Sequence, residues 1–379
     1  MYRILHLGKF AQTWRGGIES ALHDLLQGLA DLRCFRLLKI AARDQHSPQL
    51  CKTAGYLEVN VPMTGIWAGT PCCPTMPYLV WKLHQRAPFS LVHLHLPNPM
   101  AHLASEVLPA SVPRVISWHS DVVKQKKWLR FYQPSVNHLL TKSHRIIVAN
   151  PYLAEKSEQI AIARARNTID LIPYGIDLTY FSSPCAQDKL NALKQQFREK
   201  FIIFALGRHV PYKGFSYLID ALSHLPKDII LLLGGYGPLT TKLKQQSRQR
   251  GLEGRVSFLG EIPQEELPVF YKLCQVFCLP SLDKNEAFGL VQVEAMACGK
   301  PIVSCAVLPP HARVNQEGLT GFVVPPHSSE ALAQAIYQLY TSPLLCETMG
   351  RAAYEYAQQR FTRSRMITQM QQVYEEILH

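Results

Sequence analysis

The chain has 379 residues, of which 47% are apolar and 18% are charged, and 40 basic against 28 acidic residues give it a net charge of +12. Because single cores stop growing near about 250 to 300 residues, we expect two globular domains. This composition excludes a disordered or low-complexity chain, and the lack of any 18-residue uncharged apolar run excludes a membrane-spanning helix.

The opening "MYRILHLGKF" shows no cleavage pattern of a secreted protein, so we expect a cytoplasmic protein. The ten cysteines are irregularly spaced and match neither a zinc site nor a disulfide framework. We expect most of them to be buried in a reducing compartment. The net positive charge favours polyanionic partners such as nucleic acid, anionic lipid or phosphorylated ligands, and does not choose among them.

Short apolar strands alternate with amphipathic helices in the first half of the chain. The strand "YRILHLG" is followed by Gly16 and Gly17 and then by apolar residues at helical spacing from Ile18 to Leu29. Further strand candidates are "SLVHLHL", "RVISWHS" and "RIIVAN". A glycine pair between a strand and a helix favours a phosphate site, and a tight turn is the alternative interpretation.

The second half repeats this rhythm. Its strand candidates are "FIIFALG", "IILLLGG", "VSFLG", "VFCLP" and "PIVSC". Strands buried on both faces and joined by helices predict an α/β fold with one doubly wound parallel sheet in each half. We expect a first domain over 1–180 and a second over 190–361, divided in the polar segment 182–196, with a last helix near 364–379.

Doubly wound sheets bind ligands beyond the carboxyl ends of their strands. There "GRHVPYKG" follows Gly207 and presents Arg208 and Lys213, two cations that suit a phosphorylated ligand or, alternatively, are solvated surface charges. The glycine-rich "GGYGPL" at 234–239 lacks the G-x-G-x-x-G spacing of a dinucleotide fold, which weakens the hypothesis of a dehydrogenase.

The stretch "NEAFGLVQVEAMACGKPIV" holds two glutamates, Glu286 and Glu294. In a helix that begins near Phe288 with Leu290 on its buried side, Glu294 lies at the edge of the apolar stripe. A buried unpaired carboxylate costs at least about a few kcal/mol, so Glu294 needs a cation, backbone N–H groups or a ligand such as the two hydroxyls of a ribose. A core arginine is the alternative partner.

These residues resemble a known family. "EAFGLVQVE" is similar to the E-x7-E motif of the retaining glycosyltransferases of family 4, which have the GT-B architecture of two facing Rossmann-like domains. The segments "GGIE", "RIIVAN", "IPYGID", "GRHVPYKG", "GGYGP" and "GFVVPPHSSEALAQAI" follow in the family's order over nearly the whole chain. The chain looks most like bacterial polysaccharide and lipopolysaccharide mannosyltransferases. Tyr174 departs from an asparagine common in the family, and Ala11 and Gln12 depart from common prolines.

The resemblance implies an acceptor site in the first domain, a nucleotide-sugar site in the second, and a C-terminal segment, 362–379, that packs back onto the first. Arg208 and Lys213 would neutralise the leaving diphosphate, and Glu294 would bind the ribose. The remaining implied contacts are Glu286 with the amides of Phe288, Gly289 and Leu290 to the donor sugar, His119 facing that sugar or serving structure alone, and Gly16, Gly17 and Gly207 near the diphosphate.

The implied reaction retains the anomeric configuration without a nucleophilic side chain. We expect no metal or other cofactor, since no Asp-x-Asp pair occurs, and GDP-mannose is the favoured donor. A GT-B epimerase or sugar phosphate synthase is the rival enzyme. A nucleic-acid-binding protein is disfavoured, because the basic residues are dispersed and no binding motif appears.

The segment "KQKKWLRFY" at 124–132 interleaves basic and aromatic residues. This pattern suits an anionic membrane surface, and a solvated helix face with a few core aromatics is the alternative. If a membrane is the partner, the acceptor is expected to be a saccharide on a polyprenyl or other lipid carrier, at the inner face of a bacterial membrane.

Overall fold

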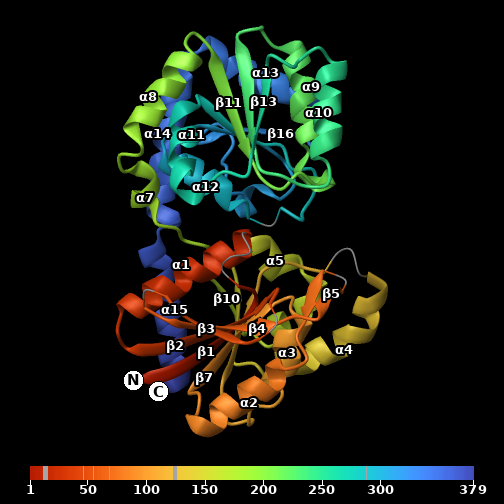
Figure 1. Cartoon of the computed structure of the whole chain (residues 1–379), viewed down its shortest axis with the longest axis vertical. Coiled ribbons are helices and arrows are strands. Elements are labelled where there is room, and N and C mark those ends of the chain that lie inside the picture. The colour runs from red at the N-terminus through yellow and green to blue at the C-terminus, as the bar shows by residue number, and fades with distance from the viewer. Residues whose placement is uncertain (12–15, 46, 54, 68, 123–125, 287) are drawn as a thin grey trace. The chain divides into compact units, whose positions relative to one another are not determined.

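The computed structural model describes residues 1–11, 16–45, 47–53, 55–67, 69–122, 126–286 and 288–379, with the backbone alone at 126–128. The chain forms two compact units (Figure 1). The first contains Met1–Gly175 and Arg363–His379, and the second contains Ile176–Thr362. Each has a largely parallel sheet covered by helices, so the predicted α/β fold of two Rossmann-like domains is confirmed.

The sheet of the first unit has eight strands in the order β10-β9-β8-β7-β1-β2-β4-β3, and all neighbours except β3 and β4 run parallel. A separate hairpin joins β5 and β6. The strands are β1 Tyr2–Phe10, β2 Phe35–Arg43, β3 Gln49–Lys52, β4 Leu57–Pro62, β5 Gly65–Trp67, β6 Thr70–Cys72, β7 Leu91–Leu96, β8 Arg114–Trp118, β9 Arg145–Val148 and β10 Ile169–Leu171. The helices are α1 Gly17–Asp31, α2 Met76–Arg86, α3 Pro99–Ser105, α4 Lys126–Lys142, α5 Pro151–Lys156, α6 Ala161–Ala165 and α15 Arg363–Leu378.

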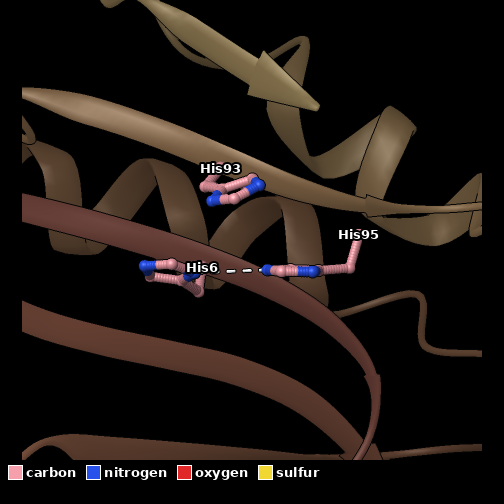
Figure 2. Close-up of side chains that lie close together, drawn as sticks. All are labelled: His6, His93 and His95. Atoms are coloured by element: carbon pink, nitrogen blue, oxygen red, sulfur yellow. Dashed lines mark hydrogen bonds between the residues drawn. The ribbon is translucent and has the colours of Figure 1, made fainter. Parts of the chain in front are cut away.

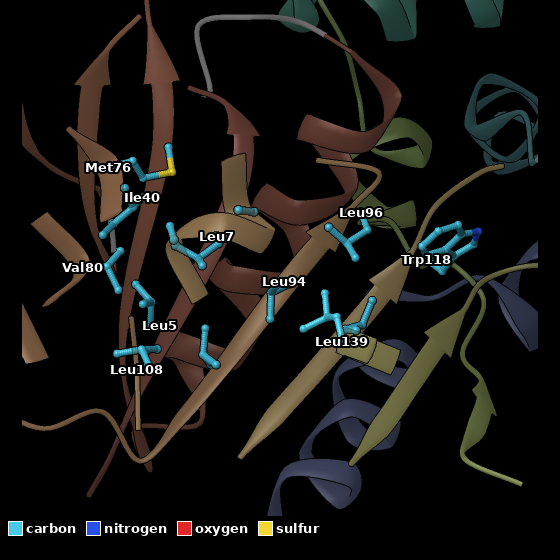
Figure 3. Close-up of a cluster of buried hydrophobic side chains, with 14 of the residues drawn as sticks. Leu5, Leu7, Ile40, Met76, Val80, Leu94, Leu96, Leu108, Trp118 and Leu139 are labelled. Atoms are coloured by element: carbon cyan, nitrogen blue, oxygen red, sulfur yellow. The ribbon is translucent and has the colours of Figure 1, made fainter. Parts of the chain in front are cut away.

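Alternate residues of these strands point to opposite faces, because side chains in a strand have a period of two. Leu5 and Leu7 of β1 and Leu94 of β7 join the core shown in Figure 3, together with Val80 of α2 and Leu139 of α4. The intervening residues face α1 and α15 in a second core. That second face also carries histidines, which are described below.

The C-terminal helix α15 packs on α1 within the first unit. Gly28 of α1 allows this close approach, since a Cβ there would lie 2.4 Å from Ile367 Cγ1. Met366, Met370 and Val373 are buried in the contact. The predicted return of the C-terminal helix to the first domain is therefore confirmed.

The sheet of the second unit has six parallel strands in the order β13-β12-β11-β14-β15-β16. Their bounds are β11 Phe201–Leu206, β12 Ile229–Gly234, β13 Val256–Gly260, β14 Val276–Leu279, β15 Ile302–Cys305 and β16 Gly321–Val324. The helices are α7 Leu178–Ser182, α8 Gln187–Gln196, α9 Phe215–Ala221, α10 Thr240–Gln249, α11 Leu267–Leu273, α12 Leu290–Ala297, α13 Ser329–Thr341 and α14 Pro343–Arg360.

The segment 182–196, which we expected to divide the domains, is part of the second unit. It contains α8, whose Leu190 is buried. Lys189 of α8 also forms an ion pair with Glu266, with 2.7 Å between Nζ and Oε1. The boundary lies at Gly175, because the "LIPYGIDLTYF" segment already contributes α7 to the second unit. A polar composition therefore marked an amphipathic surface helix instead of a linker.

The expectation for the cysteines is wrong in part. All ten are free thiols, but only Cys73, Cys274, Cys278 and Cys305 are buried. Of the other six, Cys72 is exposed and five are half-buried, in strands, loops and one helix, where a small side chain is tolerated without being covered. Among the described residues, every helix is too short or too polar to cross a membrane.

Candidate active site

Three neighbouring strands of the second sheet, β12, β11 and β14, bring their carboxyl ends together, and backbone contacts tie the loops that follow. The amide of Gly207 donates to Gly234 O at 3.2 Å, and the amide of Leu282 donates to Tyr212 O at 2.7 Å. Gly214 has φ +67°, and a Cβ there would lie 2.0 Å from Pro280 O. Only glycine fits this position, which fixes the loop of "GRHVPYKG" against the end of β14.

Lys213 and Glu286 come from two of these loops and form an ion pair. Their Nζ and Oε2 atoms lie 2.5 Å apart, and the side chains are 11% and 12% exposed. The Ser281 hydroxyl donates to the same Oε2 at 2.8 Å. Lys213 is therefore not the solvated surface charge of the alternative interpretation, and its charge is largely matched by Glu286.

Arg208 is exposed, next to this pair in the chain. The Lys213 side chain passes Gly207, whose Cβ position would lie 3.3 Å from Lys213 Cε. The structure thus brings Gly207, Lys213 and Glu286 together at the end of β11, with the exposed Arg208 beside Gly207 in the chain.

The helix that carries Glu294 begins later than we expected. Gly289, with φ +78°, is the N-cap of α12, so Phe288 and Gly289 precede the helix. Phe288 packs its ring on Phe361 at 5.6 Å. The predicted stripe is also partly wrong, because Leu290 is only half-buried whereas Gln292 is buried. The left-handed turn at Gly289 rotates the helix start relative to the sequence pattern.

Glu294 has a partner that the sequence interpretation did not name. The hydroxyl of Tyr271, on α11, donates to Glu294 Oε2 at 2.6 Å. Tyr271 is fully buried, and burial followed by the neighbouring carboxylate raises its pKa well above the usual tyrosine value. A phenol that stays protonated is a permanent donor, so it orients the half-buried Glu294.

In the first unit, Gly16 and Gly17 begin α1 as expected, with Gly16 as the N-cap. A Cβ on Gly16 would lie 2.4 Å from Glu19 Oε2, so the Glu19 carboxylate curls back over this helix start. Burial raises the pKa of Glu19, while its own backbone N–H and the nearby Lys9 and Lys39 oppose the rise. The position predicted for a phosphate thus already has an anionic neighbour within the chain.

His119 lies just beyond the end of β8 and is buried. Its Nδ1 shares a hydrogen bond with the Tyr174 hydroxyl, and its Nε2 shares one with His95 Nδ1 at 3.1 Å. The three rings stack in sequence, with 12° between His95 and His119. Burial lowers the pKa of His119 to about 4, so this imidazole is neutral near neutral pH.

His6, His93 and His95 lie close enough to be considered as metal ligands (Figure 2). Their ligand atoms are all within 4.8 Å of one another, and all three side chains are buried. Each ring nitrogen, however, has a hydrogen-bond neighbour, for example His6 Nδ1 with His95 Nε2 at 3.2 Å. A metal ion here would replace existing hydrogen bonds instead of filling a vacant site.

The sequence interpretation missed Tyr271, Ser281 and His95. The two histidines of "LVHLHL" carried a signal, because polar residues at alternate positions of a fully apolar strand must both face the same side of the sheet. Tyr271 carried no comparable signal, since its contact with Glu294 spans two helices.

The segment 124–132 is described only in part. Lys124 and Gln125 lie outside the described residues, and so do the side chains of 126–128. Of the rest, Phe131 is 80% exposed and Arg130 is exposed, whereas the Tyr132 hydroxyl contacts His102 Nδ1 at 2.8 Å.

Two parallel-sheet units, the returning helix α15 and the paired glutamate motif on the second unit define the class of GT-B glycosyltransferases. The family described as Glycosyltransferase Family 4 matches residues 15–180, and the one described as Glycosyl transferases group 1 matches residues 187–356. The chain is 30% identical over 369 residues to the D-rhamnosyltransferase WbpZ of Pseudomonas aeruginosa, covering 95% of this chain and 92% of that protein. The chain belongs to glycosyltransferase family 4 and is a glycosyltransferase enzyme.

Other relatives and structures agree with this assignment. The O-antigen chain mannosyltransferase C of Escherichia coli is 26% identical, with 99% of both chains covered. Among solved structures, HepE of Anabaena in complex with UDP and glucose superposes with a TM-score of 0.78 at 22% identity, covering 99% of this chain and 100% of that chain. The sucrose-phosphate synthase of Thermosynechococcus elongatus gives a TM-score of 0.81 at 22% identity, covering 100% and 99%. These structural likenesses establish the fold.

Proposed function

We propose that this protein is a retaining hexosyltransferase that moves a sugar, mannose being favoured, from a nucleoside diphosphate sugar to a saccharide or lipid-linked saccharide in cell-surface polysaccharide synthesis. Family membership supports the transferase reaction. The sugar is suggested by two relatives whose names specify rhamnosyl and mannosyl transfer. GDP-mannose is the first donor to test.

The observation that carries the proposal is the convergence of charged groups at the carboxyl end of β11. The exposed Arg208 follows Gly207, and the Lys213–Glu286 pair lies in the same group of loops. Because Glu286 already matches most of the Lys213 charge, Arg208 is the cation with more charge to offer a leaving diphosphate. Glu286 in turn is held in one orientation by Lys213 and Ser281, as a sugar-positioning carboxylate requires.

The proposed reaction breaks the bond between the anomeric carbon and the diphosphate oxygen. The acceptor hydroxyl bonds to the same face of that carbon, and its proton passes to the departing phosphate oxygen. No side chain forms a covalent intermediate. Arg208 and Lys213 stabilise the charge that develops on the diphosphate, which is the role a divalent cation has in other glycosyltransferases. We propose that the reaction needs no metal or other cofactor.

The donor is identified by a thermal-shift panel of GDP, UDP, ADP and TDP and their common sugar conjugates. One nucleotide should raise the melting temperature of the wild type, and this rise should be lost in Glu294→Ala. Glu253→Ala is the matched control, because Glu253 is exposed on the same unit and forms a surface ion pair with Arg248. A folded wild type that no nucleotide stabilises would contradict the proposed donor class.

Retention and metal independence need separate measurements. With the donor known, the anomeric configuration of the product is read by NMR, and an inverted product would contradict the mechanism. Turnover in EDTA should equal turnover in Mg²⁺ or Mn²⁺. A product released without any added acceptor would instead favour the epimerase.

We also propose that the acceptor is carried by an anionic membrane, with α4 in contact with the lipid. The exposed Phe131 and Arg130 support this, since an aromatic ring and a cation on one helix suit the interface. Flotation with vesicles containing phosphatidylglycerol should recover the wild type at low salt and recover less of Phe131→Ser/Arg130→Ser. Equal recovery of both proteins would contradict this docking site.

A further inference from the structure

The face of the first sheet that α1 and α15 cover carries a connected row of buried polar side chains. His6 of β1 lies beside His93 of β7, and His95 lies beside Ser117 of β8 in the strand register. All four are buried. Tyr374 of α15, which is fully buried, reaches this row from the opposite layer.

These side chains form a continuous chain of hydrogen bonds. The Tyr374 hydroxyl lies 2.6 Å from His93 Nδ1 and 3.5 Å from His6 Nε2, and His93 Nε2 lies 2.8 Å from Ser117 Oγ. The full sequence of contacts is Tyr174, His119, His95, His6, Tyr374, His93, Ser117. Each histidine uses both ring nitrogens.

Such a chain permits only two proton arrangements. A neutral imidazole has one donor and one acceptor nitrogen, so the tautomer of one ring dictates that of the next. Burial lowers the pKa of His6 to about 3 and those of His93 and His95 well below the ordinary value, so the rings are neutral. The four histidines therefore all carry the proton on Nε2, or all carry it on Nδ1.

The contact between Tyr374 and His93 favours the Nε2–H arrangement. The 2.6 Å separation of Tyr374 from His93 Nδ1 is the length of an O–H donor bond, which is shorter than an N–H donor bond. Once its proton is directed at His93, the Tyr374 oxygen accepts from His6 Nε2 at the longer distance. From His6 the same direction runs through His95 to His119, and the Tyr174 hydroxyl donates to His119 Nδ1.

We propose that Tyr374, His6 and His95 are positioning residues that fix the tautomer of His119 from within the core. Both nitrogens of His119 are then engaged inside the first unit. The Tyr174 hydroxyl, where the family often has an asparagine, is the donor at the outer end of this arrangement. The coupling of the tautomers does not rest on the proposed function.

A small cavity lies beside the two ends of this row of hydrogen bonds. It has a volume of about 20 Å³ and is lined by the ends of the chain together with apolar side chains of α1 and α15. Its polar lining residues are His95, Ser117, His119 and Tyr174. The cavity is large enough for one water molecule beside the hydrogen-bonded chain.

Imidazole ¹⁵N NMR of protein with labelled histidines tests the coupling. In the wild type at pH 7 without nucleotide, His6, His93, His95 and His119 should all show protonated Nε2. In Tyr374→Phe, His6 loses its acceptor, and an orphaned buried N–H is less well tolerated than an orphaned nitrogen lone pair. We therefore expect His6, His95 and His119 to shift together toward the Nδ1–H tautomer.

A purely structural tyrosine would change only His6 and His93, the two rings that it touches. Unchanged His95 and His119 signals in folded Tyr374→Phe would overturn the proposal. Tyr56→Phe is the matched control. Tyr56 is buried in the same core, and its hydroxyl contacts His23 Nδ1 at 3.0 Å, which does not belong to the row of hydrogen bonds. Stoichiometric transition metal in the purified wild type, detected by elemental analysis, would also overturn it.

Discussion

The two units differ in the kind of polar side chain that lies at the edge of their sheets. The second unit uses ionised side chains, with the Lys213–Glu286 pair at 2.5 Å and the exposed Arg208 nearby. The first unit uses neutral ones, with His119 and His95 buried and joined by a hydrogen bond. The difference teaches that ionised side chains stay near the surface or in pairs, whereas a deeply buried network keeps its groups neutral, because burying an unpaired charge is costly.

The largest effect that would test this contrast is acid unfolding of the first unit. Burial lowers the pKa values of His119 and His6 to about 4 and about 3, and it lowers those of His93 and His95 well below the ordinary value. Below pH 6.5 the histidines of the unfolded chain bind protons, whereas those of the folded protein stay neutral. The contribution of these neutral histidines to the free energy of unfolding is therefore fully present above pH 6.5. It falls toward pH 4, by up to about 1.4 kcal/mol per pH unit for each ring.

Tryptophan fluorescence measures this transition, because all five tryptophans lie in the first unit, at 14, 67, 81, 118 and 128. The neighbouring Lys39, which is paired with Glu58, adds to the cost of protonating His6. His138 is an exposed histidine that does not belong to the hydrogen-bonded row, so His138→Gln should leave the midpoint pH of acid unfolding unchanged. Fluorescence that stays native to pH 4 would contradict the neutral state of the network.

Replacement of the exposed cation should have the next largest effect. Arg208→Ala is expected to lower turnover by roughly 10² to 10³, because in the proposed mechanism it removes a charge that stabilises the leaving diphosphate. The melting temperature should change little, since Arg208 is exposed. Steady-state kinetics compare it with Arg248→Ala, an exposed arginine of the same unit. Turnover near that of the wild type in folded Arg208→Ala would show that the loop does not serve the diphosphate.

The buried ion pair should affect stability more than the exposed cation does. Lys213→Met leaves Glu286 with a charge that is little exposed and no longer matched, so it should destabilise the second unit by about 3 kcal/mol. The double variant Lys213→Met/Glu286→Gln should recover part of this loss. Urea denaturation followed by circular dichroism gives the double-mutant cycle, and additive effects of the two substitutions would argue against the pair.

The smallest expected effect concerns the neutral donor within the second unit. Tyr271→Phe removes the bond to Glu294 and should cost about 1.5 kcal/mol, the lower range for a hydrogen bond to a charged group. Nucleotide affinity should fall with it, because Glu294 loses its fixed orientation. Tyr340→Phe is the control, since it removes a phenol–carboxylate bond to Asp228 in the same unit. Equal nucleotide affinity of the two variants would place Glu294 outside the donor site.

The fold was predictable from local patterns to a large extent. The strands "YRILHLG", "SLVHLHL" and "IILLLGG" were correctly predicted, because a parallel strand buried on both faces is a continuous apolar run. The start of α12 was not, since the left-handed turn at Gly289 shifts it by two residues. The polar α8 was mistaken for a linker because its contacts with α11 lie outside the local pattern.

The sequence by itself determined the two parallel sheets, which follow from periodicity, and the family, which follows from motifs in fixed order along the chain. The resemblance to that family in turn implied the return of the C-terminal helix. Only the tertiary structure decided the partners of the polar groups. Lys213 meets Glu286 across 73 residues, and His93 meets Tyr374 across 281. Such pairs depend on which strands lie side by side and which helix covers them, and no local pattern encodes that choice.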